Sequence, residues 1–297
     1  MINEIKVVNS YGEELTMALI EPQFSGYAIT EISGIGPTDV DIKQTQFVSG
    51  RKYKYNAGFH KYREITLNII YYEDNIYRLR VEELRNNLYK YFATNDKIKL
   101  YFEKDNTQYA IEGYVSKHEP TFWSDACGVK IMVLCPDPWF RKIDTDYIDD
   151  TTSIFDNIDN SNKIDIIYNG DISSGLKLYM PIANDSYINN FHGQIIIETK
   201  HIITNEIRQM FLNISESYNY NGINYRLCVD LLSDNINVYI YDSQGNKIGC
   251  NGWIDSSSIS KRQEIPEILP NQNQIKVYNE GNELKFKIEY NTLYRGL

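Results

Sequence analysis

The sequence is poor in the residues from which catalytic and metal centres are usually built. Its 297 residues include four histidines and four cysteines. The histidines are scattered, and no two have the close spacing of zinc ligands. No Cys-x-x-Cys pair, Gly-x-Ser-x-Gly elbow or phosphate-binding glycine loop is present. These absences favour a protein that is not an enzyme and holds no metal or cofactor.

Long apolar runs and an excess of basic residues are also missing. No apolar stretch approaches the length of a membrane span, and the first residues have no signal-peptide core. The formal net charge is -10, whereas nucleic-acid binders cluster Lys and Arg against phosphates. The cysteines suit free thiols in a reducing cytoplasm. We therefore expect neither a membrane nor a sequence-specific nucleic-acid partner.

Tyrosine is abundant, with 25 residues, and short alternating apolar patterns recur along the chain. The length is sufficient for two domains, each with its own core. A hydrophobic content of 42% and a charged content of 24% are typical of globular proteins. Because tyrosine and isoleucine favour extended backbone, the composition predicts a mainly β protein.

The first 140 residues predict a β-sheet or sandwich with one helix and a protruding hairpin. Helical spacing of apolar residues predicts the helix over residues 75–93. Residues 44–61, here called the arm, are a long polar and aromatic stretch that is either an extended hairpin or a mobile loop. Alternation predicts strands at residues 5–8, 15–20, 27–32, 64–72, 98–102, 109–115 and 129–134.

The last of these strands runs into a proline-rich sequence that we call the closing motif. Its prolines cannot donate ladder hydrogen bonds, and each biases the preceding residue towards extended geometry. An Asp-rich stretch with little to bury follows, so we expect domains at 1–140 and 164–297, joined by a linker over 141–163. The closing motif consists of Cys135, Pro136, Asp137, Pro138, Trp139 and Phe140.

Residues 164–297 carry short apolar segments at regular spacing, separated by turns rich in glycine and asparagine. Repeated short strands with such punctuation are typical of an all-β sandwich or jelly roll.

Taken in order, these segments resemble the distal tail (Dit) proteins of bacteriophages with long flexible tails. The resemblance implies a ring-forming, tail-tube-like domain at 1–140 and a galectin-like β-sandwich at 164–297. It rests on the closing motif, Ser33-Gly-Ile-Gly-Pro37, Arg63-Glu-Ile-Thr-Leu67, Tyr168-Asn-Gly-Asp171, Leu269-Pro-Asn-Gln-Asn-Gln-Ile275 and Tyr294-Arg-Gly-Leu297.

The resemblance implies a structural protein at the tip of the phage tail, assembled in the cytoplasm of the bacterial host. Such a hub forms a homo-hexameric ring with a channel for DNA. One face meets the tail tube protein, and the other meets the tail tip or baseplate hub protein; a receptor-binding protein is a further candidate partner. We expect the arm to be a subunit interface with these anchors: Phe47, Arg51, Tyr53, Tyr55 and Phe59.

Two alternatives remain open at this stage. One is the hub of a contractile tail or of a phage-tail-like bacteriocin. The other is a module that binds carbohydrate on the host surface, with Trp253 stacked on a sugar. The His-x-Asn-x-Arg element of galectins is missing, however, and a shared fold does not by itself transfer a site.

Overall fold

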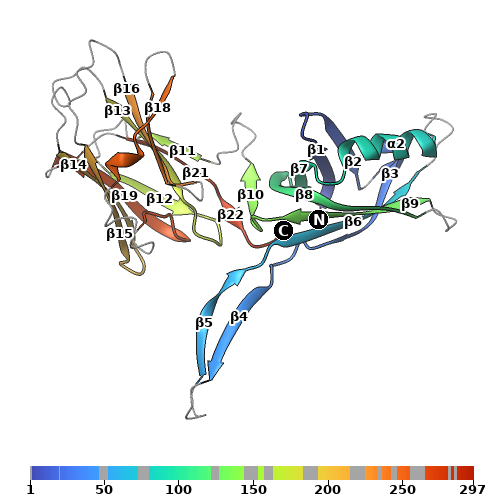
Figure 1. The fold of residues 1–297 in the computed structure, drawn as a ribbon, viewed down its shortest axis with the longest axis horizontal. Coiled ribbons are helices and arrows are strands. Elements are labelled where there is room, and N and C mark those ends of the chain that lie inside the picture. The colour runs from blue at the N-terminus through green and yellow to red at the C-terminus, as the bar shows by residue number, and fades with distance from the viewer. Residues whose placement is uncertain are drawn as a thin grey trace. The chain divides into compact units, whose positions relative to one another are not determined.

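The structure is a computed structural model, and it divides the chain into two compact units (Figure 1). Unit 1 contains Met1–Thr145 and Tyr294–Leu297, and unit 2 contains Asp146–Leu293. The structure describes all residues except 1, 20, 47–52, 73–79, 122–126, 144–152, 157–162, 183–192, 215–224, 233–235, 242–245, 255–264, 280–281 and 284–285.

These units differ from the domains expected from the sequence. The last four residues lie in unit 1, although the sequence places them at the end of the second domain. The expected linker, 141–163, begins inside β10 (Phe140–Ile143) and also contains β11 (Ser153–Asp156). Both strands pair with other strands, which a solvated linker would not do.

Unit 1 is built on a single sheet of nine strands. Its main path runs β2-β1-β7-β8-β9-β6-β3, with β10 beside β8 and β22 beside β10. These strands are β1 (Ile2–Val8), β2 (Glu14–Ala18), β3 (Tyr27–Ser33), β6 (Arg63–Tyr71), β7 (Lys97–Lys104), β8 (Thr107–Thr121), β9 (Gly128–Cys135), β10 and β22 (Leu293–Tyr294).

One face of this sheet is covered by α2 (Val81–Tyr91), which buries Leu84 and Leu88 among the strand side chains (Figure 1). The described helix begins later than residue 75, because Arg80 has extended backbone geometry; residues 73–79 lie outside the described chain. The prediction of one helix was incomplete. A short helix, α1 (Pro22–Ser25), begins with proline and ends at Gly26 in the left-handed conformation.

The arm lies within a hairpin of two antiparallel strands, β4 (Val40–Gln46) and β5 (Tyr53–His60), drawn side by side in Figure 1. Of the two interpretations left open by the sequence, the extended hairpin is therefore correct. Within the described chain these strands form a sheet of their own, with no third strand beside them.

Unit 2 is a β-sandwich of two sheets. One sheet has the order β11-β21-β13-β16-β17-β18, and the other has the order β12-β19-β14-β15, with β20 beside β19. Its remaining elements are β12 (Lys163–Tyr168), β13 (Leu176–Ile182), β14 (Gly193–His201), β15 (Ile207–Ile214), β16 (Tyr225–Asp230), β17 (Asn237–Tyr241), β18 (Lys247–Gly249), η1 (Asn251–Trp253), β19 (Asn271–Asn279), β20 (Asn282–Glu283) and β21 (Lys287–Tyr290).

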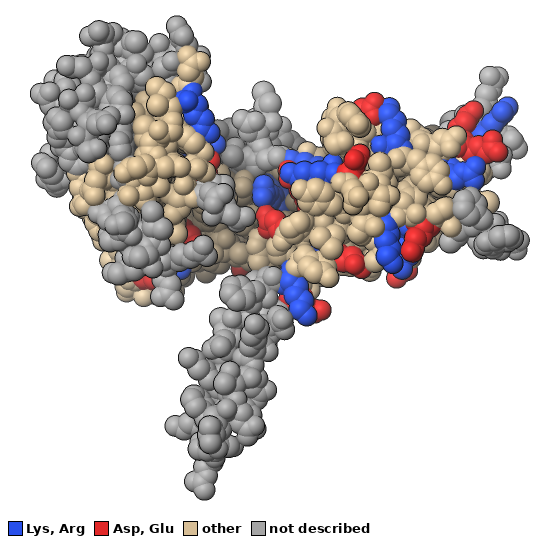
Figure 2. All heavy atoms as spheres, viewed as in Figure 1, with Lys and Arg blue, Asp and Glu red and all other residues tan. Residues whose placement is uncertain are grey.

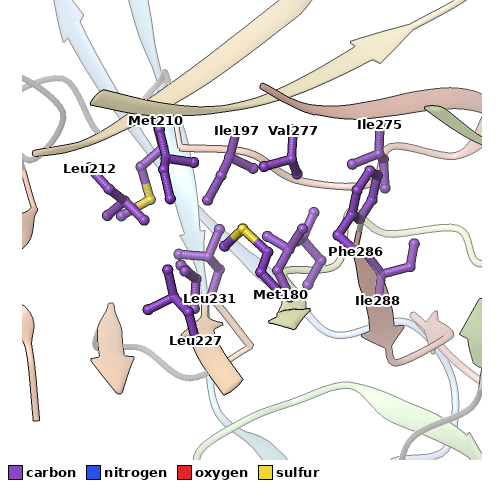
Figure 3. Close-up of a cluster of buried hydrophobic side chains, with 14 of the residues drawn as sticks. Met180, Ile197, Met210, Leu212, Leu227, Leu231, Ile275, Val277, Phe286 and Ile288 are labelled. Atoms are coloured by element: carbon purple, nitrogen blue, oxygen red, sulfur yellow. The ribbon is translucent and has the colours of Figure 1, made fainter. Parts of the chain in front are cut away.

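The core of unit 2 lies between its two sheets, and Figure 3 shows side chains of both sheets pointing towards one another. Every second residue of a strand faces this core, as alternation requires. The mainly β fold predicted from the sequence, with a sandwich in the second half, is thereby confirmed. The facing side chains include Ile197, Met210 and Val277 from one sheet and Met180, Leu227 and Ile288 from the other.

Two adjacent isoleucines on β12 test this arrangement. Ile166 is 2% exposed and Ile167 is 68% exposed. Ile166→Ala leaves a cavity in the core, so we expect a loss of about 2–5 kcal/mol in the free energy of unfolding of unit 2. Ile167→Ala is the matched control and should change it by less than about 0.5 kcal/mol. Chemical denaturation measures both, and equal losses would contradict the register of β12.

Candidate functional site

The closing motif interrupts a strand instead of ending the sheet. Along one side of β8, the pairs with β9 end where Leu134 lies opposite Tyr114. The pairs with β10 then begin on the same side, where Arg141 lies opposite Ala110. Arg141 comes seven positions after Leu134, whereas their partners on β8, Tyr114 and Ala110, are only four positions apart. The closing motif therefore contains three residues more than the facing stretch of β8. The expectation that Phe140 closes the domain was wrong, because Phe140 is the first residue of β10.

The side chains of the closing motif lie partly in the core and partly in solvent. Cys135, Pro138 and Phe140 are buried, whereas Pro136 and Asp137 are exposed. The Phe140 ring meets the edge of Phe102 at 5.7 Å between centroids. Both ends of the motif are therefore anchored in the hydrophobic core of unit 1.

Asp137 forms hydrogen bonds on the exposed side of the closing motif. Its carboxylate accepts a hydrogen bond from the Trp139 backbone N–H at 3.4 Å and another from Arg141 Nη2 at 3.0 Å. These contacts keep the short turn between the two prolines in one conformation.

The centre of the site is Arg63, the first residue of β6. This residue is 2% exposed. Its guanidinium lies over the Phe140 ring at 4.5 Å from the centroid. Nε donates to Pro138 O at 2.7 Å and Nη2 donates to Arg295 O at 2.5 Å. Nη1 donates to the carbonyl oxygens of Gly34 and Gly36, both at 2.5 Å. One buried cation thus joins three segments that are distant in sequence.

Backbone carbonyls, and not a carboxylate, stabilise this charge in the part of the chain that the structure describes. Burial lowers the pKa of Arg63 from its usual value, yet a guanidinium keeps its proton in proteins. Burial also raises the pKa of the neighbouring Cys135 thiol to about 12, so this cysteine is neutral at pH 7. The buried positive charge of Arg63 is consequently surrounded by oriented carbonyl dipoles.

The loop at residues 33–37 and the chain's C-terminus meet beside this charge. Ile35 O accepts a hydrogen bond from the Leu297 N–H at 3.0 Å, between the two glycine carbonyls that Arg63 uses. Gly34 has a φ of 81°, and a Cβ there would collide with Glu64 O. A Cβ on Gly296 would press against Ile35 O and the Gly36 carbonyl carbon. A residue larger than glycine would therefore clash with the neighbouring backbone at either Gly34 or Gly296.

The closing residues Tyr294–Leu297 thus serve unit 1, not the sandwich. Tyr294 packs edge-on against Tyr109 of β8, with ring centroids 5.5 Å apart. Sequence reasoning did not identify Arg63 as the residue that joins these segments. The alternation of β6 could have indicated that Arg63 is buried, because Arg63 lies on the same face of the strand as Ile65 and Leu67, which face the core.

The arm residues proposed as anchors are described only in part. Phe47 and Arg51 lie outside the described residues. Tyr53, Tyr55 and Phe59 lie on β5, where their backbones pair with Gln46, Gln44 and Asp41 respectively. Their place on the hairpin is defined; their role as anchors stays a prediction.

One of the four histidines is buried: His201, at the end of β14. Its Nε2 donates to Pro270 O at 2.8 Å, and its Nδ1 accepts from the Thr204 hydroxyl at 2.7 Å. Since both ring nitrogens are bonded within the fold, His201 stabilises the β14–β15 turn.

The carbohydrate alternative placed its contact at Trp253, which lies in η1; its side chain is outside the described part of the structure. Large exposed apolar side chains do gather elsewhere on unit 2, at the end of its five-stranded sheet. They are aliphatic, with no flat ring on which a sugar could stack: Ile167, Ile202, Ile203 and Ile207. This surface does not favour sugar binding.

Metal-binding clusters and membrane-spanning helices are both missing from the described residues. No three His, Cys, Asp or Glu side chains there lie close enough together to bind a metal ion. None of the described helices has the length and apolarity that crossing a bilayer would require.

Replacing Arg63 tests its central position. Arg63→Met removes four hydrogen bonds from a buried side chain to backbone carbonyls, so we expect unit 1 to lose about 3 kcal/mol of unfolding free energy. Arg63→Lys should recover only part, because an ammonium cannot span the four acceptors. The control is Arg141→Gln, which removes an exposed ion pair and should cost about 0.5 kcal/mol. Equal effects of Arg63→Met and Arg141→Gln in urea unfolding would refute this role.

Cysteine reactivity provides a second test. Cys127 is exposed, and the other three cysteines are buried. Burial raises the pKa of Cys228, like that of Cys135, to about 12, so neither forms the reactive thiolate near neutral pH. A thiol reagent at pH 8 should modify one cysteine per native chain and all four in denaturant. Cys127→Ser should remove the native reaction, and a second fast equivalent would contradict this packing.

Comparison with known proteins finds similar chains among solved structures. No protein-family model and no curated sequence matches the chain. Among solved structures, the Dit protein of phage SPP1, described as a paradigm of the hub adsorption apparatus in phages that infect Gram-positive bacteria, matches with a TM-score of 0.58 at 10% identity. The match covers 97% of this chain and 98% of that one.

Chains from two structures of the activated phage p2 baseplate, with Sr and with Ca, match at TM-scores of 0.46 and 0.48, with 10% and 9% identity. They cover 96% and 98% of this chain and 97% and 98% of their own. The resemblance read from the sequence is thus confirmed at the level of fold: over nearly its whole length, this chain has the fold of the SPP1 distal tail protein.

Proposed function

We propose that this protein is a structural component of a phage virion, a distal tail hub that joins the tail tube to the tip. The observation that carries the proposal is the fold shared with SPP1 Dit over 97% of the chain. The proposed partners are the tail tube protein on one face and the tail tip or baseplate hub protein on the other. The proposed role is architectural and not enzymatic, with assembly in the host cytoplasm.

The structure of the arm favours the proposal that identical subunits form a ring. A two-stranded hairpin with no third strand is marginally stable in water, so β4 and β5 are expected to gain a neighbour on assembly. A cyclic ring needs two different, complementary surfaces on each subunit. An aromatic hairpin that reaches over the next subunit would supply one of them, with Tyr53, Tyr55 and Phe59 on β5 as candidate contacts.

The charges of unit 1 suit a channel that DNA passes without binding. On the sheet face opposite α2, Lys97 pairs with Glu112 at 2.6 Å and Lys6 pairs with Glu14 at 3.4 Å. Figure 2 shows Lys and Arg side chains interspersed with Asp and Glu over the described part of unit 1 on the face drawn. Such pairs offset part of the positive charge that phosphates would otherwise meet, so a lumen lined by this sheet face would hold DNA weakly.

The solution mass of the purified protein tests the hub. Six chains of 34.7 kDa should form a closed ring of roughly 210 kDa with a central hole in negative-stain images. A monomer that also failed to bind the tube and tip proteins would refute the proposal.

The arm is tested in the same assay. Replacing Tyr53, Tyr55 and Phe59 together by alanine should lower the mass to that of the monomer without changing the circular dichroism spectrum. Ile203→Ala, an exposed position on unit 2, is the control and should leave the ring intact. A ring that forms equally well from the triple variant would show that the arm is not the contact.

A further inference from the structure

We propose that the last four residues, Tyr294–Leu297, act with Arg63 as a latch that fixes the root of the arm. The root is defined here as residues 34–39 together with Lys61, the segments from which β4 and β5 emerge. That the latch matters for assembly rests on the proposed function of the arm; that it orders the root does not.

The root is held from both sides by hydrogen bonds to consecutive carbonyls. Arg63 Nη1 binds Gly34 O and Gly36 O, and the Leu297 N–H binds Ile35 O between them. Lys61 N–H donates to Asp39 O at 3.3 Å and closes the root where the two strands separate.

Arg63 also binds the latch itself, because its Nη2 donates to Arg295 O. Loop and C-terminus are therefore joined directly, through the Leu297–Ile35 bond, and indirectly, through one shared guanidinium. Hydrophobic contacts add to this, since Ile35, Tyr294 and Leu297 all pack partly buried against the core of unit 1. Loss of the C-terminal residues would remove one side of the root and one acceptor of a buried charge.

The arm depends on its root more than an ordinary hairpin does. Within the described chain β4 and β5 have no neighbouring strand to set their direction. The root is consequently the place where the arm is attached to the sheet, at β3 and β6. A hairpin whose root is loose would sample many directions and pay an entropic cost each time it docked on a partner.

The order of the chain gives this latch a consequence for assembly. Unit 2 lies between the first part of unit 1 and the latch, so the latch is synthesised after both. The arm root can be completed only after all of unit 2 has been made. Chains that stop before Tyr294 would then present a poorly oriented arm and join rings inefficiently.

Gly296→Val is the most direct test, because its side chain would press on Ile35 O and the Gly36 carbonyl carbon while every other residue is kept. Hydrogen exchange measured by mass spectrometry on the full-length protein should show on the order of tenfold faster exchange at residues 34–39 and in β4 and β5. Exchange in β7 and throughout unit 2 should not change. A chain that lacks residues 294–297 should show the same pattern, more strongly.

Gly249→Val is the matched control, since a Cβ at Gly249 meets nothing within 4 Å. Unchanged exchange at the root in both the Gly296→Val and the truncated proteins would overturn the latch. If exchange in unit 2 also rises, the change is global unfolding, and the milder Gly296→Ala then decides by the same criterion.

The ring assay separates the latch from the proposed function. Faster root exchange together with a lower yield of rings supports both. Faster root exchange with normal ring yield keeps the ordering role of the latch but rejects its importance for assembly. Normal root exchange rejects the latch whether or not rings form.

Discussion

The buried charge of Arg63 is the constraint around which unit 1 is organised. A guanidinium out of water is tolerated only if its donors are bonded, and here the acceptors are carbonyls from the 33–37 loop, the closing motif and the C-terminus. Because a guanidinium presents its donors in a rigid fork, it sets the relative positions of these segments. The three extra residues of the closing motif and the glycines of the loop are features that allow the carbonyls to reach it.

This arrangement links the two ends of the chain through the same sheet. The N-terminal strands and the last residues belong to one unit, and the sandwich is inserted between them. The sandwich has no comparable buried charge among its described residues, and its core is built by alternating apolar residues on two sheets. The two units thus differ in their polar groups: unit 2 buries hydrogen-bonded neutral side chains such as His201, whereas unit 1 is built around the buried charge of Arg63.

Much of the fold could be predicted from local patterns. Alternation identified the strand around Ile65, and regular turns indicated a sandwich, because each is decided by neighbours within a few positions. The helix was predicted to begin at residue 75, whereas the described helix follows the extended Arg80, and α1 was missed because four residues show no period. Local patterns also could not choose between a loop and a hairpin for the arm.

The mainly β fold, the sandwich and the apolar strand faces that become its core follow from the order of side chains along each strand. Three features emerge only from the folded chain: Arg63 points inward to four carbonyls, Phe140 starts a strand, and Tyr294–Leu297 return to unit 1. These contacts join residues as far apart as Arg63 and Arg295, and no local periodicity records such a pairing. Their physical basis is the requirement that a buried cation be satisfied, which becomes visible only when the whole chain is folded.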